Sequence, residues 1–232
     1  MKQYEHLFFD LDGTLWNFEA NAKDALHECF SENKLCERGI GDYEVFYEKY
    51  LFHNNRLWDR YSKGFIKQDE LKWKRMWLTL LDFKIADEPL AKKISVEFLE
   101  LLPLRKKVFP YALDVLHYLK NKNYHLHLIT NGFECVQKNK VQNAGLAGFF
   151  DHLITSEASG YLKPNKEIFA FALDKANAKT AQSIMIGDNV ETDIKGAQNA
   201  GLDTVFANYS NSKTEVKPTF EITDLRQLET IF

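Results

Sequence analysis

The segment His6–Trp16, HLFFDLDGTLW, constrains the fold of this chain more than any other stretch of its sequence. Its apolar run Leu7-Phe8-Phe9 is typical of a strand that is buried on both faces, and such strands belong to parallel sheets. Asp10 and Asp12 follow at a spacing of two, which places both carboxylates on the same side of an extended chain. The glycine that comes next permits a sharp exit from the strand.

Two carboxylates held so close together repel each other. At a separation of about 4 Å and an effective dielectric constant near 20, the repulsion is roughly 4 kcal/mol. A fold keeps such a pair where a cation or a shared proton offsets this repulsion. We therefore expect the rest of the chain to supply a cation at the end of the first strand.

A helical block follows this strand directly. From Asn17 to Glu88 the chain contains no proline and few glycines, and its apolar residues recur at helical spacing. Four amphipathic helices are predicted here, and Pro103 ends the last of them. An all-helical block placed after a single strand indicates an inserted cap. We predict a core domain made of residues 1–15 and 105–232, and a cap domain made of residues 16–104.

Helices and strands alternate in the remainder of the chain. Further strands are predicted at four short apolar runs: residues 125–130, 152–155, 183–186 and 204–207. This alternation predicts an α/β fold, in which a Rossmann-like parallel sheet carries helices on both faces. Ligands of such sheets bind outside the carboxyl ends of the strands. Asp10, Thr130 and Asp188 each follow an apolar run closely, so we expect these three side chains to converge at one edge of the sheet.

The acidic residues suit phosphoryl chemistry. Asp10 is the candidate nucleophile, because a carboxylate can attack phosphorus and form an acyl phosphate. Asp12 is the candidate general acid, which protonates the leaving oxygen and then helps to activate water. Asp188 and Asp193 are candidate ligands of a hard divalent ion, for which Mg²⁺ is the best match. Asp193 equally suits the first turn of a helix, where an acid offsets the helix dipole.

Phosphate-binding groups are predicted from two further segments. The hydroxyl of Thr130 is a candidate donor to a phosphate oxygen, and the Asn131-Gly132 turn after it offers a backbone N–H. A cation is also needed opposite the metal, because negative charge develops on the equatorial phosphate oxygens. Lys163, which is followed by a proline, is the candidate for this charge.

Taken together, these motifs resemble those of the haloacid dehalogenase-like superfamily. Four motifs carry the resemblance in order: DLDGT at 10–14, TNG at 130–132, KP at 163–164 and GDNVETD at 187–193. The resemblance extends over essentially the whole chain, and it implies a Rossmann-like core with a helical cap inserted after the first strand. It also implies aspartyl-phosphate chemistry with Mg²⁺ bound by Asp10, by the backbone carbonyl of Asp12 and by Asp188.

Softer features are similar to those of bacterial pyrimidine 5′-nucleotidases. These are ITNGF at 129–133, KPNKEIF at 163–169, TFEITDL at 219–225, and Leu57-Trp58 ahead of Tyr61 and Gly64. They imply a nucleoside 5′-monophosphate as substrate. Four aromatic residues are candidate contacts to its base: Trp16, Phe18, Trp58 and Tyr61. Aromatic residues at helical spacing are nevertheless more often part of a hydrophobic core.

Other functions stay open at this point. The same core also serves phosphatases and mutases of sugar phosphates or other small metabolites, and an acidic pocket also serves receiver-type phosphoacceptor modules. A receiver needs no enclosing cap, which argues against that reading. A dehalogenase is disfavoured because displacement of an alkyl halide does not need the acid/base that Asp12 offers. A dinucleotide-binding protein is disfavoured because no GxGxxG follows the first strand.

Charge and composition narrow the class of partner. The net charge of −3, with lysines and arginines scattered along the chain, argues against binding to nucleic acid. No segment approaches the ~18 apolar residues of a membrane span. The three cysteines lack metal-ligand spacing and suit a reducing compartment. We expect a cytoplasmic enzyme, a monomer or weak dimer, that acts on a small phosphate monoester.

Overall fold

The computed structural model of the protein describes residues 4–232. The chain divides into two compact units. One unit, the α/β unit, contains residues 4–18 and 106–232, and the other, the helical unit, contains residues 19–105. Each unit is described by itself below.

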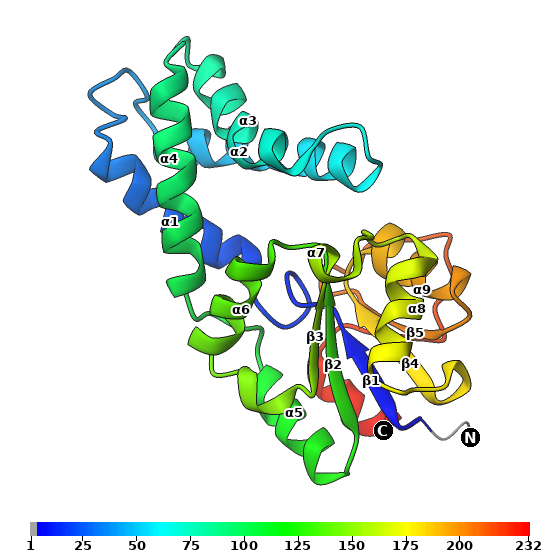
Figure 1. Cartoon of the computed structure of the whole chain (residues 1–232). Coiled ribbons are helices and arrows are strands. Elements are labelled where there is room, and N and C mark those ends of the chain that lie inside the picture. Colours follow the sequence, from blue (N-terminus) through cyan, green and yellow to red (C-terminus); the bar gives the residue numbers. More distant parts are fainter. Residues whose placement is uncertain (1–3) are drawn as a thin grey trace. The chain divides into compact units, whose positions relative to one another are not determined.

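A parallel six-stranded sheet forms the centre of the α/β unit, which confirms the predicted fold class (Figure 1). The strands are β1 (His6–Phe9), β2 (His125–Thr130), β3 (His152–Thr155), β4 (Ser183–Gly187), β5 (Asp203–Ala207) and β6 (Phe220–Ile222). Their spatial order is β3-β2-β1-β4-β5-β6. The chain builds outward from β1 on one side and then crosses to its other side with β4. The gap between the ends of β1 and β4 is therefore the topological switch point, where open α/β sheets bind ligands.

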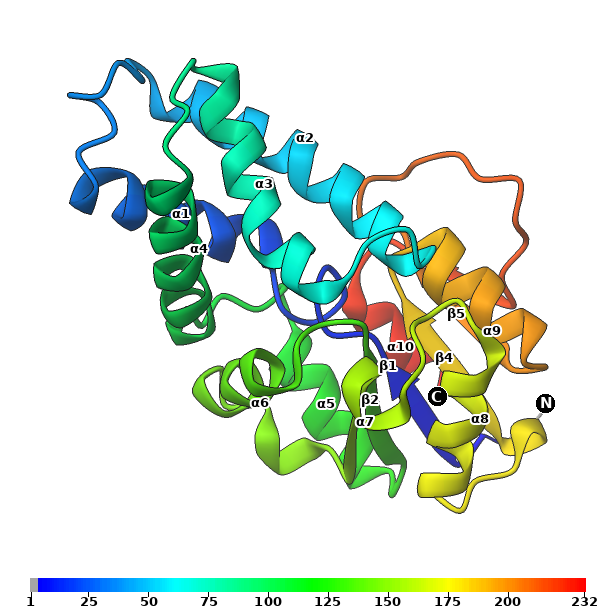
Figure 2. The ribbon, with the colours of Figure 1, turned by 45° about the horizontal axis from the view of Figure 1, so that its top comes forward.

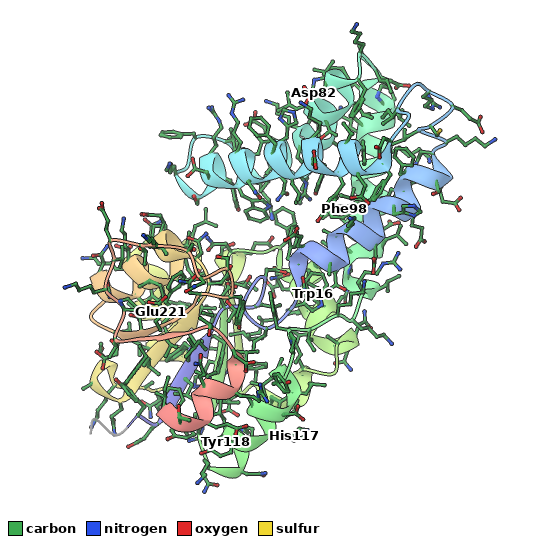
Figure 3. All side chains as sticks on the ribbon, turned by 180° about the vertical axis from the view of Figure 1, so that it is seen from behind. Trp16, Asp82, Phe98, His117, Tyr118 and Glu221 are labelled. Atoms are coloured by element: carbon green, nitrogen blue, oxygen red, sulfur yellow. The ribbon has the colours of Figure 1, made fainter. Side chains whose placement is uncertain are left out.

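Helices cover both faces of this sheet. They are α5 (Ala112–Asn121), α6 (Glu134–Asn143), α7 (Ser156–Ser159), α8 (Lys166–Lys175), α9 (Gly196–Asn199) and α10 (Leu228–Ile231). Short 3₁₀ turns span residues 147–149, 180–182 and 225–227, and a π-helix spans Val190–Lys195. Helices α8 and α9 lie on the face that is in front in Figure 1. Helices α5 and α10 lie on the opposite face, which Figure 3 shows with Tyr118 of α5 labelled.

Side chains from alternate strand positions form the core between the sheet and α8. Phe8, Ile129 and Met185 belong to three neighbouring strands and pack with Ile168 and Phe169 of α8. All five side chains are fully buried. Because successive residues of a strand point to opposite faces, this packing fixes which residues of each strand face α8.

The strand β6 is absent from the strands predicted above. It contains only three residues, lies at the edge of the sheet and pairs with β5 alone. A three-residue strand with a single partner leaves little hydrophobic pattern in the sequence, so periodicity does not reveal it.

The helical unit contains the four predicted helices: α1 (Phe18–Glu32, whose first residue belongs to the α/β unit), α2 (Tyr43–Ser62), α3 (Gln68–Asp82) and α4 (Glu88–Leu101). A 3₁₀ turn at Leu102–Leu104 follows α4. Asp42 and Asp87 cap α2 and α4 by accepting hydrogen bonds from first-turn N–H groups. Figure 2 shows α2 and α3 side by side, which agrees with the contacts between them. In the described part of the chain, no helix has the length and apolar character needed to cross a membrane.

Candidate active site

The candidate site lies at the switch point of the sheet. Asp10 directly follows β1, and its backbone N–H donates to the carbonyl of Ile186 in β4 at 2.8 Å. Asp188 directly follows β4, and Thr130 is the last residue of β2. The parallel strands therefore bring three segments that are far apart in sequence to the same edge, as predicted from the apolar runs that precede them.

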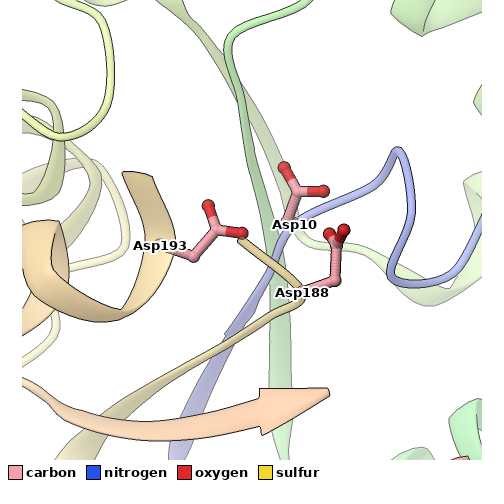
Figure 4. Close-up of side chains that lie close together, drawn as sticks. All are labelled: Asp10, Asp188 and Asp193. Carbon is pink, nitrogen blue, oxygen red and sulfur yellow. The ribbon is translucent and has the colours of Figure 1, made fainter. Parts of the chain in front are cut away.

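Three carboxylates meet at this edge (Figure 4). Asp10, Asp188 and Asp193 each offer one oxygen, and these oxygens all lie within 4.8 Å of one another. Asp10 and Asp193 are buried, and Asp188 is half-buried. Hard oxygen ligands gathered in this way match the ligand set of a divalent ion such as Mg²⁺. The residues present therefore fit the metal that the sequence predicts.

Lys163 lies next to two of these acids. Its ammonium donates to Oδ1 of Asp10 at 2.5 Å, to Oδ1 of Asp193 at 2.7 Å and to the carbonyl of Ile129 at 2.8 Å. A lysine ammonium has three protons, so all three are matched by oxygen acceptors. The side chain is almost completely buried. Three carboxylates and one ammonium leave this cluster with a formal charge of −2 when all four groups are ionised.

The titration of these groups reflects that imbalance. Burial raises the pKa of Asp10 well above its ordinary value, and the charges of Asp193 and Asp188 add to the shift, while Lys163 opposes it. Burial, together with the charge of Asp193, raises the pKa of Asp188 to about 7. Burial alone lowers the pKa of Lys163, but Asp10 and Asp193 outweigh it and leave the pKa above its ordinary value. The single positive charge of Lys163 does not balance three ionised carboxylates, so a further cation would favour their ionised forms.

Thr14 holds Asp188 in place, a role that the sequence analysis did not assign. Its hydroxyl donates to Oδ1 of Asp188 at 2.9 Å and accepts the backbone N–H of the same residue at 3.0 Å. The chain reaches this position through Gly13, which has φ +92°. A Cβ at Gly13 would lie 2.4 Å from Oδ2 of Asp188. The glycine of the DLDGT motif therefore serves both the turn and the close approach of the second acid.

Asp193 belongs to a π-helix, which brings its side chain to the cluster. The π-helix spans Val190–Lys195 and is followed directly by α9. Asn189 begins it, because its side-chain oxygen accepts two backbone N–H groups from the first turn. Oδ2 of Asp193 in turn accepts the N–H of Asn189 at 3.1 Å. π-Helical turns often occur at functional sites.

All three residues of the TNG turn make hydrogen bonds within the protein. The N–H of Gly132 donates to the hydroxyl of Thr130 at 3.0 Å. The side chain of Asn131 makes two hydrogen bonds to the backbone of Lys163: its amide donates to the carbonyl at 2.8 Å, and its oxygen accepts the N–H at 2.7 Å. Asn131 thus positions the lysine segment, and Gly132 orients Thr130. Direct contacts of these two residues with phosphate stay a prediction.

The carboxylate of Asp12 is not a member of the three-carboxylate cluster, and both of its oxygens contact α6. Oδ2 accepts from the amide of Gln137 at 2.7 Å, and Oδ1 accepts from the ammonium of Lys140 at 2.6 Å. Sequence reasoning missed both partners. The helix ECVQKNKVQN has few apolar residues, although it belongs to the core domain. A core helix that lacks an apolar face has to bury polar side chains, and this is the signal that could have identified them.

The four candidate base contacts have different environments. Trp16 is fully buried, and Phe18 is half-buried beside it with ring centroids 6.5 Å apart. Trp58 and Tyr61 are half-buried neighbours on α2 of the helical unit, with ring centroids 5.7 Å apart. Their contact with a nucleobase stays a prediction.

Comparison with known proteins agrees with this fold. A family model described as haloacid dehalogenase-like hydrolase matches residues 4–201. Pyrimidine 5′-nucleotidase YjjG of Escherichia coli is 30% identical, and the match covers 98% of this chain and 97% of YjjG. Glyceraldehyde 3-phosphate phosphatase of Pyrococcus furiosus is 29% identical, with 98% of this chain and 92% of that protein covered.

A solved structure gives the same result for the fold. The magnesium-bound crystal structure of YfnB from Bacillus subtilis matches this chain with a TM-score of 0.90 at 28% identity, and 99% of each chain is covered. The parallel sheet, the acidic cluster at its switch point and the family model agree with the resemblance predicted from the four motifs. The chain belongs to the haloacid dehalogenase-like hydrolase family.

Proposed function

We propose that this hydrolase is a magnesium-dependent phosphomonoesterase that dephosphorylates nucleoside 5′-monophosphates through an aspartyl phosphate on Asp10. The observation that carries the proposal is the charge of the cluster. Three carboxylates with oxygens within 4.8 Å of one another face one lysine. When all four groups are ionised, the cluster's net charge of −2 matches a divalent cation. The magnesium in the structure of YfnB supports the same choice of metal for this chain.

The first step of the proposed reaction uses Asp10 and Asp12. An oxygen of Asp10 attacks phosphorus, and the bond between phosphorus and the ester oxygen breaks. Its electron pair stays on the leaving oxygen, which takes a proton from Asp12. Mg²⁺, held by Asp10, Asp188 and the backbone carbonyl of Asp12, with Asp193 nearby, would offset the negative charge of the phosphoryl group and the carboxylates.

The second step regenerates the enzyme. Water attacks the phosphorus of the aspartyl phosphate and gives a proton to Asp12, and the bond between phosphorus and the Asp10 oxygen breaks. Thr130 donates a hydrogen bond from its hydroxyl to a phosphoryl oxygen in both steps, and Lys163 supplies positive charge beside Asp10. Inorganic phosphate and the dephosphorylated alcohol are the products.

The choice of substrate rests on the relatives. YjjG is named a pyrimidine 5′-nucleotidase and matches this chain over nearly its whole length. The phosphatase of Pyrococcus furiosus acts on glyceraldehyde 3-phosphate and matches over a similar length, so a sugar-phosphate substrate is the second candidate. The motif features shared with nucleotidases favour the nucleotide.

The covalent mechanism is tested by Asp10→Asn. An amide is a far weaker nucleophile than a carboxylate, so this variant is expected to lose phosphate release by at least about 10⁴-fold while keeping its fold. Asp174→Asn, an exposed change on α8, is the matched control and should keep full activity. Phosphate release and circular dichroism are measured together. Near-normal turnover by a folded Asp10→Asn protein would rule out the aspartyl phosphate.

Specificity is tested with a panel of phosphate esters in the presence of Mg²⁺. Uridine, thymidine, cytidine and adenosine 5′-monophosphates are compared with glyceraldehyde 3-phosphate and glucose 6-phosphate through kcat/KM. Nucleotides, with pyrimidines ahead, should give the highest values. If each nucleotide is turned over far more slowly than either sugar phosphate, the nucleotidase assignment is wrong and the second candidate stands.

A further inference from the structure

Two polar side chains of α6 are buried although the proposed reaction gives them no task. Gln137 and Lys140 are 1% and 2% exposed. They are three residues apart in a helix, so they occupy the same face. Burial of an amide or an ammonium costs free energy unless hydrogen bonds or an ion pair offset it. Among the contacts that offset it are hydrogen bonds to Asp12 and Thr130 of the proposed reaction and cation–π contacts with two neighbouring rings.

Both oxygens of Asp12 are held from this helix. Lys140 donates to Oδ1 at 2.6 Å, and Gln137 donates to Oδ2 at 2.7 Å. Rotation of the carboxylate about its last bond would break both hydrogen bonds, and charge-assisted bonds of this kind are the strong ones. Helix α6 therefore holds the carboxylate of the candidate general acid in its orientation.

The amide of Gln137 also contacts Thr130, the candidate hydrogen-bond donor to the phosphate. The same nitrogen donates to the hydroxyl oxygen of Thr130 at 2.7 Å, and that oxygen already accepts the N–H of Gly132. A hydroxyl oxygen has two acceptor sites, and both are now occupied, so its own proton is the group left to donate. Gly132 makes this possible, because a Cβ there would lie 2.4 Å from Cδ of Gln137.

Aromatic rings hold the ammonium of Lys140 in place. It lies 4.2 Å from the ring centroid of Trp16 and 5.6 Å from that of Phe18. Cation–π contacts of a desolvated ammonium are attractive, and the two rings also limit its access to water. Trp16 and Phe18 therefore support a charge beside Asp12.

We propose that Gln137 and Lys140 are positioning residues of the reaction. They fix the position of the Asp12 carboxylate relative to the Thr130 hydroxyl. Asp12 can then protonate the leaving oxygen of the same phosphate ester whose phosphoryl oxygen Thr130 binds. The inference rests on the proposed function, because it needs Asp12 as the acid.

The test compares two esters that differ in how much they need an acid. p-Nitrophenyl phosphate releases a stable phenolate, whereas the alcohol oxygen of benzyl phosphate has to be protonated as it leaves. Enzyme in excess over ester, with Mg²⁺, isolates the release of the leaving group from the later hydrolysis. Gln137→Met and Lys140→Met should slow benzyl alcohol release by about 10–100-fold, as expected when a catalytic group is misplaced, and nitrophenol release far less. Lys138→Met, an exposed change on the same helix, should slow neither.

A double-mutant cycle distinguishes this role from a structural one. If Lys140 acts through Asp12, then Lys140→Met should cost little in an Asp12→Asn background. The two α6 variants are independent, so the loss of one to misfolding, detected by circular dichroism, leaves the other as the test. Equal slowing of both esters by the folded α6 variants would overturn the inference. Equal slowing of both esters by Asp12→Asn itself would instead overturn the acid role of Asp12, and with it the proposed function.

Discussion

At the scale of single residues, the candidate active site combines opposing electrostatic effects on the carboxylate of Asp10. Asp10 is buried beside two further carboxylates, and Lys163 is the cation that contacts it in the described structure. Burial and the neighbouring acids favour its protonated form, while the lysine favours the ionised form that a nucleophile needs. A divalent ion at the proposed metal site would add to the effect of the lysine, so the proposed function predicts that metal binding favours the ionised form of Asp10.

Gly13→Ala tests the close approach of the DLDGT turn to Asp188. An added Cβ faces a carboxylate oxygen at 2.4 Å, and φ +92° strains any L side chain. We expect a stability loss of about 1–2 kcal/mol from the backbone, and an activity loss of about 10²-fold from the displaced carboxylate. The control is Gly39→Ala, which has φ +100° and no atom within 4 Å of its Cβ.

Both variants should lose stability in urea unfolding, and only Gly13→Ala should lose activity. A Gly13→Ala enzyme with the activity of Gly39→Ala would show that Asp188 tolerates the displacement.

His127 predicts a pH dependence of stability that is separate from the active site. Burial, reinforced by the neighbouring His6, lowers its pKa from 6.5 to about 3. Its ring also neighbours His152, and Asp151 opposes the shift. The folded state binds fewer protons than the unfolded state between these values, so stability is complete above pH 6.5 and falls as the pH is lowered toward 3.

His127→Phe removes the titrating group while keeping a ring beside Phe8, whose centroid lies 4.7 Å from that of His127. The urea midpoint of this variant should fall less than that of the wild type between pH 7 and pH 5. The same decrease in both proteins would assign the pH dependence to other groups.

At the scale of elements, the turns and helices after the strands determine which residues face the site. Asn131 holds the Lys163 segment, the π-helix delivers Asp193, and α6 holds Asp12. Asn131, the π-helix and α6 each begin within a few residues of a strand end. The position of the strand therefore determines, through a short chain segment, where the side chain lies.

Phe98→Ala tests the packing of α4 within the helical unit. Phe98, which is labelled in Figure 3, is 1% exposed. Its ring meets that of Tyr50 of α2 edge to face, with centroids 5.5 Å apart. Truncation of a buried phenylalanine costs about 3–5 kcal/mol, because apolar burial is lost and a cavity is left. Val96→Ala, on the exposed side of the same helix, should change stability by less than about 0.5 kcal/mol. Chemical unfolding followed by tryptophan fluorescence measures both, and comparable losses would contradict the packing.

At the scale of the whole molecule, metal binding should stabilise the folded chain. An ion that binds only the folded state at 100 times its dissociation constant adds about 2.7 kcal/mol. Mg²⁺ should therefore raise Tm relative to EDTA at matched ionic strength. Asp188→Asn should lose most of this increase, and Asp174→Asn should keep it. An equal increase in all three proteins would place the stabilising ion elsewhere.

The sequence alone identified the parts of this protein that depend on local pattern. Apolar runs revealed β1 to β5, helical periodicity revealed the helices of the helical unit, and the residues after three strands were expected to meet at one edge. These inferences succeed because a strand buried on both faces needs a continuous apolar run, and because parallel strands end at a common edge.

Only the tertiary structure showed which polar groups contact each other. Three sets of hydrogen bonds join segments up to 174 residues apart: those of Asp12 with α6, of Thr14 with Asp188 and of Asn131 with Lys163. A hydrogen bond between distant segments leaves no periodicity in the sequence, because each partner alone resembles an ordinary polar residue. The motif residues were therefore visible in the sequence, and the network that orients them came from the fold.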